Sequence, residues 1–193
     1  MTLHRAGPIF TSVQRGERVM PERHDKGAAG VRKGLYTPEE RRRRDETVWT
    51  LVQGILAPAQ FLVFLVSFGF VVRFMATGEG YGLATGSIVL KTGILYLIMV
   101  TGAIWEKVVF GRYLFAPAFF WEDVFSFVVI ALHTAYLYAL FAGLPPATQM
   151  WIALAAYATY VVNAAQFLLK LRAARLQAEA EEREMAMEEG LPA

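Results

Sequence analysis

The carboxylic side chains best placed to do chemistry lie between two long apolar stretches of the chain. Glu106 ends one stretch, and Glu122 and Asp123 stand close to the start of the next. An ionisable group at the edge of hydrocarbon is energetically costly, so each is a candidate functional residue. At the mouth of an apolar pocket, desolvation would keep one carboxyl group protonated and make it a general acid. We therefore predict that Glu106, Glu122 and Asp123 form the catalytic set.

A structural interpretation of the same cluster stays open. Lys107 and Arg112 lie in or beside the connection between the two stretches, so they could form ion pairs with the carboxylates at a membrane surface. Glu122 and Asp123 also fall near the expected start of a helix, where negative charge is favourable without any catalytic role.

His133 is the most specific single candidate for a ligand-binding residue, because it is a histidine deep within an apolar stretch. In a helix it would share a stripe with Glu122, which would lie about 16 Å away along the axis. A neutral imidazole can ligate the metal ion of a bound ligand through one ring nitrogen. A hydrogen bond to a neighbouring helix is the alternative, and the sequence leaves both open.

Four apolar stretches dominate the chain, at about residues 49–72, 83–105, 117–141 and 147–169. Each has the roughly 20 residues that a helix needs to cross about 30 Å of hydrocarbon. A helix satisfies its own backbone hydrogen bonds in lipid, and these stretches lack the polar face of a soluble helix. We predict an all-α fold, an integral membrane four-helix bundle.

The few polar residues inside these stretches have expected places. Lys91 lies near one end of the second stretch, so we expect its ammonium group to snorkel outward to the interface. The polar side chains of the fourth stretch share one helical face, which predicts interhelical hydrogen bonds. These side chains are Tyr160, Asn163, Gln166 and Lys170.

The distribution of positive charge predicts the orientation of the bundle. Residues 1–48 hold 11 of the 19 Lys and Arg residues, and the middle connection carries Lys107 and Arg112. The connections at residues 75–82 and 143–148 carry none. Positive charge marks the cytoplasmic side, so we expect both termini in the cytoplasm and a multi-pass membrane protein.

Three regions follow from these patterns. Residues 1–36 are basic and poor in apolar side chains, which predicts a disordered cytoplasmic segment. Residues 37–172 form the predicted transmembrane domain, and residues 173–193 a charged cytoplasmic helix or tail.

The transmembrane domain opens with a strong helix-start signal. Thr37, Pro38 and Glu40 match a capping box with proline in the first helical position. The arginine run at residues 41–44 follows on this helix, a few residues before the first span. We expect it to contact anionic lipid headgroups rather than nucleic acid.

Composition removes several classes of chemistry. The chain has 193 residues, 55% of them hydrophobic, and no cysteine. Disulfides, zinc–thiolate sites, iron–sulfur clusters and thiol nucleophiles are therefore excluded. We expect no metal site of the protein's own and no cofactor.

Long strings of the chain are similar to one enzyme family. They are LYTPEERRRRD at 35–45, TGAIWEKVVFG at 101–111, FAPAFFWED at 115–123, ALHTAY at 131–136 and YVVNAAQFLLK at 160–170. Together they resemble the bacteriochlorophyllide vinyl hydratase family of photosynthetic bacteria, over about residues 35–175.

The resemblance implies a hydro-lyase that adds water to the C3-vinyl group of a magnesium tetrapyrrole, giving a 1-hydroxyethyl group in bacteriochlorophyll biosynthesis. It also implies membrane lipid and other enzymes of that biosynthesis as partners. The alternative is a pigment carrier or assembly factor for photosynthetic complexes, which would bind the same pigment without changing it. The expected substrate-binding residues are His133, Arg112, Lys107, Trp105, Trp121 and Asn163.

The predicted topology is testable with reporter fusions. Fusions at Gly80 and Pro145 should report the non-cytoplasmic side, and fusions at Gly111 and the C-terminus the cytoplasmic side, because positive loops stay inside. A cytoplasmic signal at Gly80 would overturn the four-span arrangement.

Overall fold

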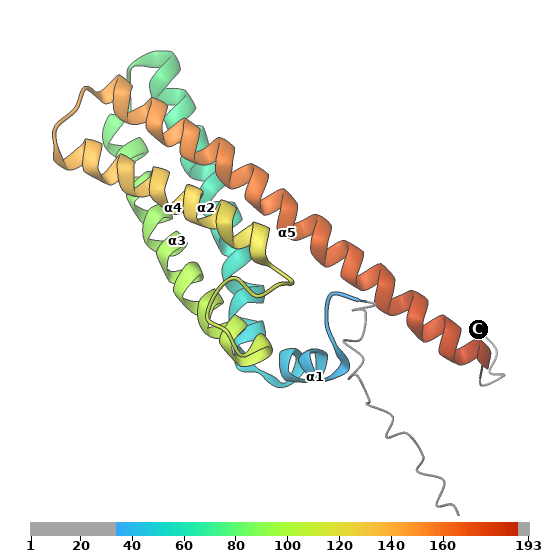
Figure 1. Cartoon of the computed structure of the whole chain (residues 1–193). Helices are drawn as coiled ribbons and strands as arrows, with labels where there is room; N and C mark the ends of the chain where they lie inside the picture. The colour runs from blue at the N-terminus through green and yellow to red at the C-terminus, as the bar shows by residue number, and fades with distance from the viewer. Residues whose placement is uncertain (1–33, 189–193) are drawn as a thin grey trace, which may run out of the picture. The chain divides into compact units, whose positions relative to one another are not determined.

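The computed structural model describes residues 34–188, which form α-helices joined by short loops and contain no β-strand. The predicted disorder of the N-terminal segment up to residue 33 lies outside the described residues. The helices are α1 (Pro38–Glu46), α2 (Val48–Thr77), α3 (Tyr81–Phe110), α4 (Phe120–Phe141) and α5 (Pro146–Glu188) (Figure 1). Within the described chain, four helices are long and apolar enough to cross a membrane, which confirms the predicted all-α architecture.

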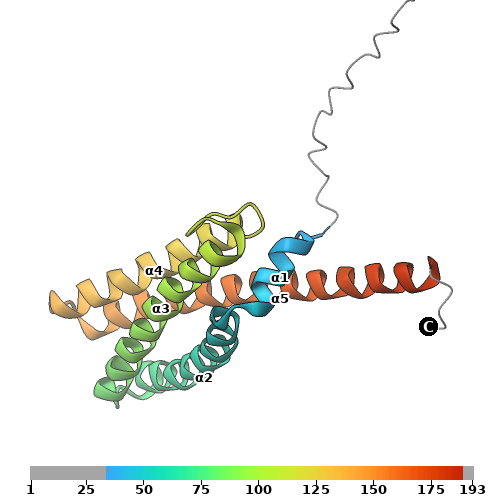
Figure 2. The ribbon, with the colours of Figure 1, turned by 90° about the horizontal axis from the view of Figure 1, so that it is seen from below.

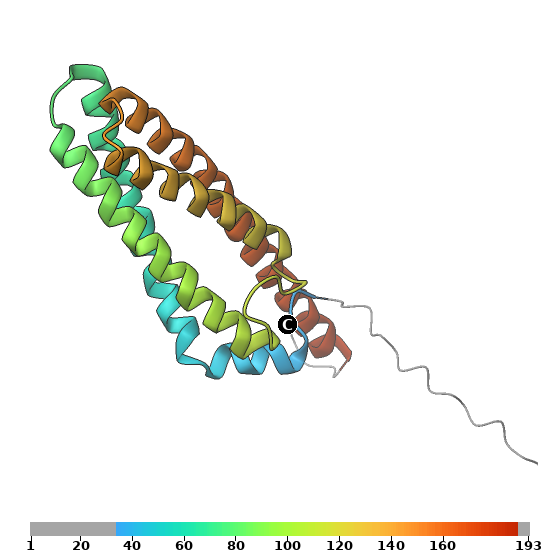
Figure 3. The ribbon, with the colours of Figure 1, turned by 60° about the vertical axis from the view of Figure 1, so that its left-hand side comes forward.

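The four long helices pack as two hairpins. α2 packs most extensively against α3, and α4 against α5, whereas contacts between the hairpins are fewer. The α2–α3 and α4–α5 loops lie at one end, which we call the hairpin end (Figures 1 and 3). The α3–α4 loop lies at the opposite end beside α1, and we call this the loop end (Figures 2 and 3).

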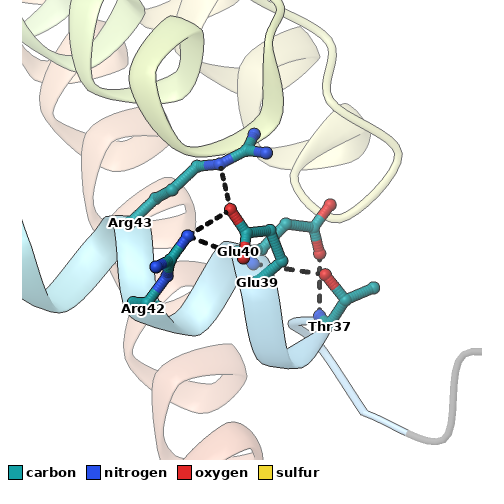
Figure 4. Close-up of polar contacts among 5 residues, drawn as sticks. All are labelled: Thr37, Glu39, Glu40, Arg42 and Arg43. Carbon is teal, nitrogen blue, oxygen red and sulfur yellow. Dashed lines mark hydrogen bonds and ion pairs between the residues drawn. The ribbon is translucent and has the colours of Figure 1, made fainter.

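The start of α1 confirms the capping box. The Thr37 hydroxyl accepts a hydrogen bond from the Glu40 N–H at 3.2 Å, and the Glu40 carboxylate accepts one from the Thr37 N–H at 2.8 Å (Figure 4). Glu39 pairs with Arg42 at 2.9 Å and with Arg43 at 3.2 Å. The hydrogen bond from Arg42 holds the pKa of Glu39 below its usual value.

Two helix boundaries differ in detail from the predicted spans. α4 begins at Phe120 rather than at residue 117, because residues 116–119 form a turn in which the Phe119 N–H donates to the Ala116 carbonyl at 2.8 Å. α5 continues far beyond residue 169, to Glu188, and extends past the loop ends of the other long helices (Figures 1 and 2).

Aromatic packing holds the loop end together. Tyr36 falls in the segment expected to be disordered, yet it is buried and its ring stacks on Phe110 at 5.8 Å. The Arg44 guanidinium lies over the Tyr36 ring, 4.8 Å from its centre. Burial raises the pKa of the Tyr36 hydroxyl, and the neighbouring Arg44 partly offsets this. α1 is thereby fixed against the end of α3.

Polar side chains in the spans turn inward. The Ser67 hydroxyl bonds to the Tyr157 hydroxyl at 2.5 Å and to the Ser87 hydroxyl at 2.8 Å, which ties α2 to α5 and α3. Gln53 donates to the Thr101 hydroxyl at 2.8 Å, a second link between α2 and α3. The outward faces are apolar and exposed, as lipid contact requires.

Candidate functional site

The α3–α4 loop is held by two buried carboxyl groups. The Phe115 N–H donates to Asp123 Oδ2 at 2.6 Å, and the Ala116 N–H donates to Glu106 Oε2 at 3.2 Å. Glu106 ends α3 and Asp123 lies in the first turn of α4, so the loop folds back onto both helices. The structure therefore brings together two of the three predicted catalytic residues.

Phe115 adopts an unusual backbone conformation in this loop. Its φ of 58° lies in the left-handed region, where a non-glycine residue costs about 1–3 kcal/mol. The hydrogen bond to Asp123 opposes this strain, and the Phe115 ring stacks on Phe127 at 5.5 Å. The path of the loop therefore depends on Asp123.

The Glu106 and Asp123 carboxyl groups are also close enough to influence each other electrostatically. Both side chains are buried, with 5% of Glu106 and 4% of Asp123 exposed. Ionised carboxylates only accept hydrogen bonds, so a bond between the two requires one shared proton. The pair thus offers a proton donor and a proton acceptor at one point.

Glu122 is buried beside this pair but has a different partner. Its Oε2 atom lies 2.5 Å from Lys170 Nζ, which also donates to the Ala118 carbonyl. Lys170 comes from the predicted polar face of α5, so α5 is tied to both the start of α4 and the loop before it. A carboxylate in such an ion pair is an acceptor, with no proton to give.

His133 lies ten residues after Asp123 on α4, further inside the bundle, and is fully buried. Its Nδ1–H donates to the Val129 carbonyl at 2.8 Å, which leaves the Nε2 lone pair free to accept. A backbone carbonyl on the second ring nitrogen is the usual support of a metal-ligating histidine. In this structure Nε2 lies 3.2 Å from Lys91 Nζ.

Lys91 is where the sequence-based expectation was wrong. It does not snorkel outward, because its side chain is fully buried and its ammonium group contacts His133 and lies 3.9 Å from the centre of the Tyr160 ring. The rings of Tyr157 and Phe64 are at 5.3 Å and 5.9 Å. Electron-rich aromatic faces can stabilise a buried cation in this way.

The other predicted binding residues are spread over the loop end. Arg112 and Lys107 are exposed, and Lys107 donates to the Gly111 carbonyl at 2.9 Å. Trp105 packs between Phe110 and Phe119, whereas Trp121 is 66% exposed on the outer face of α4. The two tryptophans therefore do not form one surface.

Asn163 is the binding candidate that reaches the bundle interior. Its amide Nδ2 donates to the Ser126 hydroxyl at 2.9 Å, which joins α5 to α4. Ser126 is one helical turn beyond Asp123, so Asn163 lies near the carboxyl pair. No cluster of three metal-ligating side chains occurs among residues 34–188.

Comparison with known proteins places this arrangement in a family. A sequence model of the 2-vinyl bacteriochlorophyllide hydratase family matches residues 36–173. The chain is 72% identical to the 2-vinyl bacteriochlorophyllide hydratase of Cereibacter sphaeroides over 152 residues, which cover 79% of this chain and 95% of that protein. It is 75% identical to the protein of the same name from Rhodobacter capsulatus over 151 residues, 78% of this chain and 88% of that protein.

The chain belongs to the 2-vinyl bacteriochlorophyllide hydratase family. The predicted family resemblance is confirmed, and the matched residues contain α1 to α4, the α3–α4 loop and the membrane-spanning part of α5. No solved structure matches the chain.

The hydrogen bond between Asp123 and the α3–α4 loop of this hydratase family member can be tested by proteolysis. Asp123→Ala should expose the loop to trypsin at Arg112 and raise the cleavage rate roughly fivefold or more, because one backbone hydrogen bond to a buried carboxyl group is lost. Asp123→Asn should stay close to the wild-type rate, since the amide oxygen can still accept from Phe115. Equal cleavage of the wild type and Asp123→Ala would show that the hydrogen bond does not hold the loop.

Proposed function

We propose that this protein is a membrane hydro-lyase that adds water to the C3-vinyl group of a chlorophyllide-type magnesium tetrapyrrole. The observation that carries the proposal is its 72% and 75% identity to two proteins named 2-vinyl bacteriochlorophyllide hydratase, over most of each chain. The product carries a 1-hydroxyethyl group and belongs to bacteriochlorophyll synthesis.

The reaction needs one acid and one base. A carboxylic acid gives its proton to the terminal vinyl carbon, and the inner carbon becomes a cation that the macrocycle delocalises. The oxygen of water bonds to this inner carbon, and a carboxylate accepts the proton that the water loses. Because the proton count is restored in each cycle, the step requires no cofactor.

The Glu106–Asp123 pair is the best-placed source of both groups. One proton shared between two carboxyl groups leaves a donor and an acceptor side by side, buried where water cannot compete freely. Glu122 completes the predicted catalytic set as an acceptor held by Lys170. In this proposal its role is to fix the electrostatics and the position of the pair.

Substrate recognition follows from the shape and charge of the pigment. A flat apolar macrocycle is expected to bind between membrane helices. Its propionate would pair with Arg112 or Lys107, which are the exposed cations of the α3–α4 loop region. Trp105, Trp121 and Asn163 remain predicted contacts of the macrocycle, and His133 a predicted ligand of its magnesium.

The location is the cytoplasmic membrane of a bacterium, with the loop end on the cytoplasmic side. The basic residues of α1 and the α3–α4 connection support this orientation, since Lys and Arg accumulate on that side. The arginines of α1 would contact anionic lipids, and neighbouring enzymes of bacteriochlorophyll synthesis would supply and receive the pigment.

Amide variants test the acid–base pair. Glu106→Gln and Asp123→Asn should each lower the rate of hydration by roughly 10²–10⁴-fold while pigment binding persists, because the amide keeps the loop hydrogen bond but cannot transfer a proton. Turnover is followed by the change in the visible spectrum when the vinyl group leaves conjugation.

Glu79→Gln is a matched control, since Glu79 is an exposed carboxylate in the α2–α3 loop at the hairpin end. Near-normal turnover in the Glu106 and Asp123 variants would place the chemistry elsewhere. A purified wild-type protein that binds the vinyl pigment and never alters its spectrum would favour the pigment carrier.

His133 can be tested as a magnesium ligand. His133→Ala should weaken binding of the magnesium pigment tenfold or more and leave binding of the metal-free pigment unchanged, because only the metal requires the imidazole. A general loss of stability would affect both pigments alike. Equal affinity changes for the two pigments would assign His133 a structural role with Lys91.

A further inference from the structure

Three amide oxygens inside the bundle have no hydrogen-bond partner among the described residues. They are Gln60 Oε1, Asn163 Oδ1 and Gln166 Oε1. Only 2% of the Gln60 surface and 9% of the Asn163 surface are exposed. A buried carbonyl oxygen without a donor is unfavourable, and more so where the surroundings are hydrocarbon.

The three side chains lie on α2 and α5, two helices that contact each other at the seam between the two hairpins. Phe64 of α2 and Tyr160 of α5 pack with ring centres 5.0 Å apart, which fixes the level of these antiparallel helices. One turn from this contact toward the loop end, Gln60 occupies the corresponding position on α2 and Asn163 on α5. Gln166 follows one turn further along α5.

The Glu106–Asp123 pair lies close to Asn163 along the bundle. Asn163 bonds to Ser126 at 2.9 Å, and Ser126 lies three residues beyond Asp123, about 4.5 Å along the axis of α4. Lys170, one turn beyond Gln166, is bonded to Glu122. The unpartnered oxygens therefore lie between the buried Lys91 layer and the carboxyl pair, within about one to two turns of Asp123.

The hydrogen-bonding properties of these amide oxygens indicate what kind of ligand could bind to them. An amide oxygen accepts hydrogen bonds, so its partner must bear an O–H or N–H group. A vinyl group can donate none, whereas water and the 1-hydroxyethyl product both can. A buried water donates at most two hydrogen bonds, so one water can bridge two of these oxygens, or one of them and the carboxylate, and can accept from the carboxylic acid.

We propose that Gln60, Asn163 and Gln166 form a water-binding site that positions the reactant water and then accepts the hydroxyl group of the product. They are positioning residues: the carboxyl pair transfers the protons, and the amides hold the oxygen near the inner vinyl carbon. This inference rests on the proposed hydration, because a carrier that never meets reactant water has no use for such a site.

The first measurement is equilibrium binding, which requires no turnover. In the Glu106→Gln background, which should bind pigment without hydrating it, the protein in nanodiscs should bind the 3-(1-hydroxyethyl) pigment more tightly than the 3-vinyl pigment. Gln60→Met, added to that background, should lose this preference by roughly 5–100-fold while binding the vinyl pigment as before, because one donor–acceptor pair inside the protein is lost. Asn163→Leu should lose the preference too. Asn163→Asp, which keeps an acceptor oxygen, should retain it.

The second measurement compares the effects of the substitutions on kcat and on KM. Gln60→Met should lower kcat by a similar factor with little change in KM for the pigment, and Asn163→Leu should lower kcat as well. Gln53→Met is the matched control, because this glutamine is on the same helix and its amide is already bonded to Thr101. If Asn163→Leu does not fold, Gln60→Met carries the test, since the Gln60 oxygen holds no other residue.

The outcomes separate this inference from the proposed function. Hydration by the wild type with unchanged pigment preference and unchanged kcat in Gln60→Met and Asn163→Leu would overturn the water site alone. Absence of hydration by the wild type would overturn the proposed function. Loss of preference in Gln53→Met as well would show that the effect belongs to packing, and would also overturn the water site.

Discussion

A polar side chain within a span is stabilised only by partners inside the protein, and this constraint organises most of the bundle. Hydrocarbon offers no hydrogen bonds, so an unpaired polar group there costs several kilocalories per mole. The helices therefore rotate until their few polar groups face one another. The resulting links join all four spans: Gln53–Thr101, Ser67–Tyr157, Lys91–His133, Asn163–Ser126 and Lys170–Glu122.

The same constraint connects the loop to the chemistry. Residues 111–119 contain backbone N–H groups that must be satisfied near the membrane, and the buried Glu106 and Asp123 carboxyl groups accept two of them. These carboxyl groups thus serve the fold and are also the best candidates for proton transfer. Substitution by alanine would remove both the loop hydrogen bond and the proton-transfer group. Substitution by the amide removes only proton transfer, because the amide oxygen still accepts the hydrogen bond.

Local patterns in the sequence predicted what depends on local physics. The capping box at Thr37 and the four spans followed from spacing alone, and the structure contains them. Of the polar face of α5, Asn163 and Lys170 form the predicted interhelical hydrogen bonds. The rotation of α3 did not follow, because a lysine near a span end can point outward or inward. The burial of Lys91 depends on His133 and Tyr160, which lie on other helices.

The pairing of Glu106 with Asp123 was also beyond the sequence, although both were in the predicted set. It depends on the path of the α3–α4 loop, which passes through Phe115 in a left-handed conformation. A phenylalanine rarely adopts this conformation, so nothing in the local pattern signals the turn. Only the tertiary contact with Asp123 explains it.

Addition of water to an apolar pigment sets two opposing requirements, and the bundle meets them in different places. The macrocycle is bound best by a dry surface, whereas the reaction consumes a polar molecule that such a surface excludes. Paired carboxyl groups and unpartnered amide oxygens both lower the stability of an apolar core, and a pigment carrier would gain from their replacement by packed apolar side chains. Their presence near one another is the arrangement that the proposed hydration needs, because it would bring acid, base and water to one part of an otherwise apolar seam.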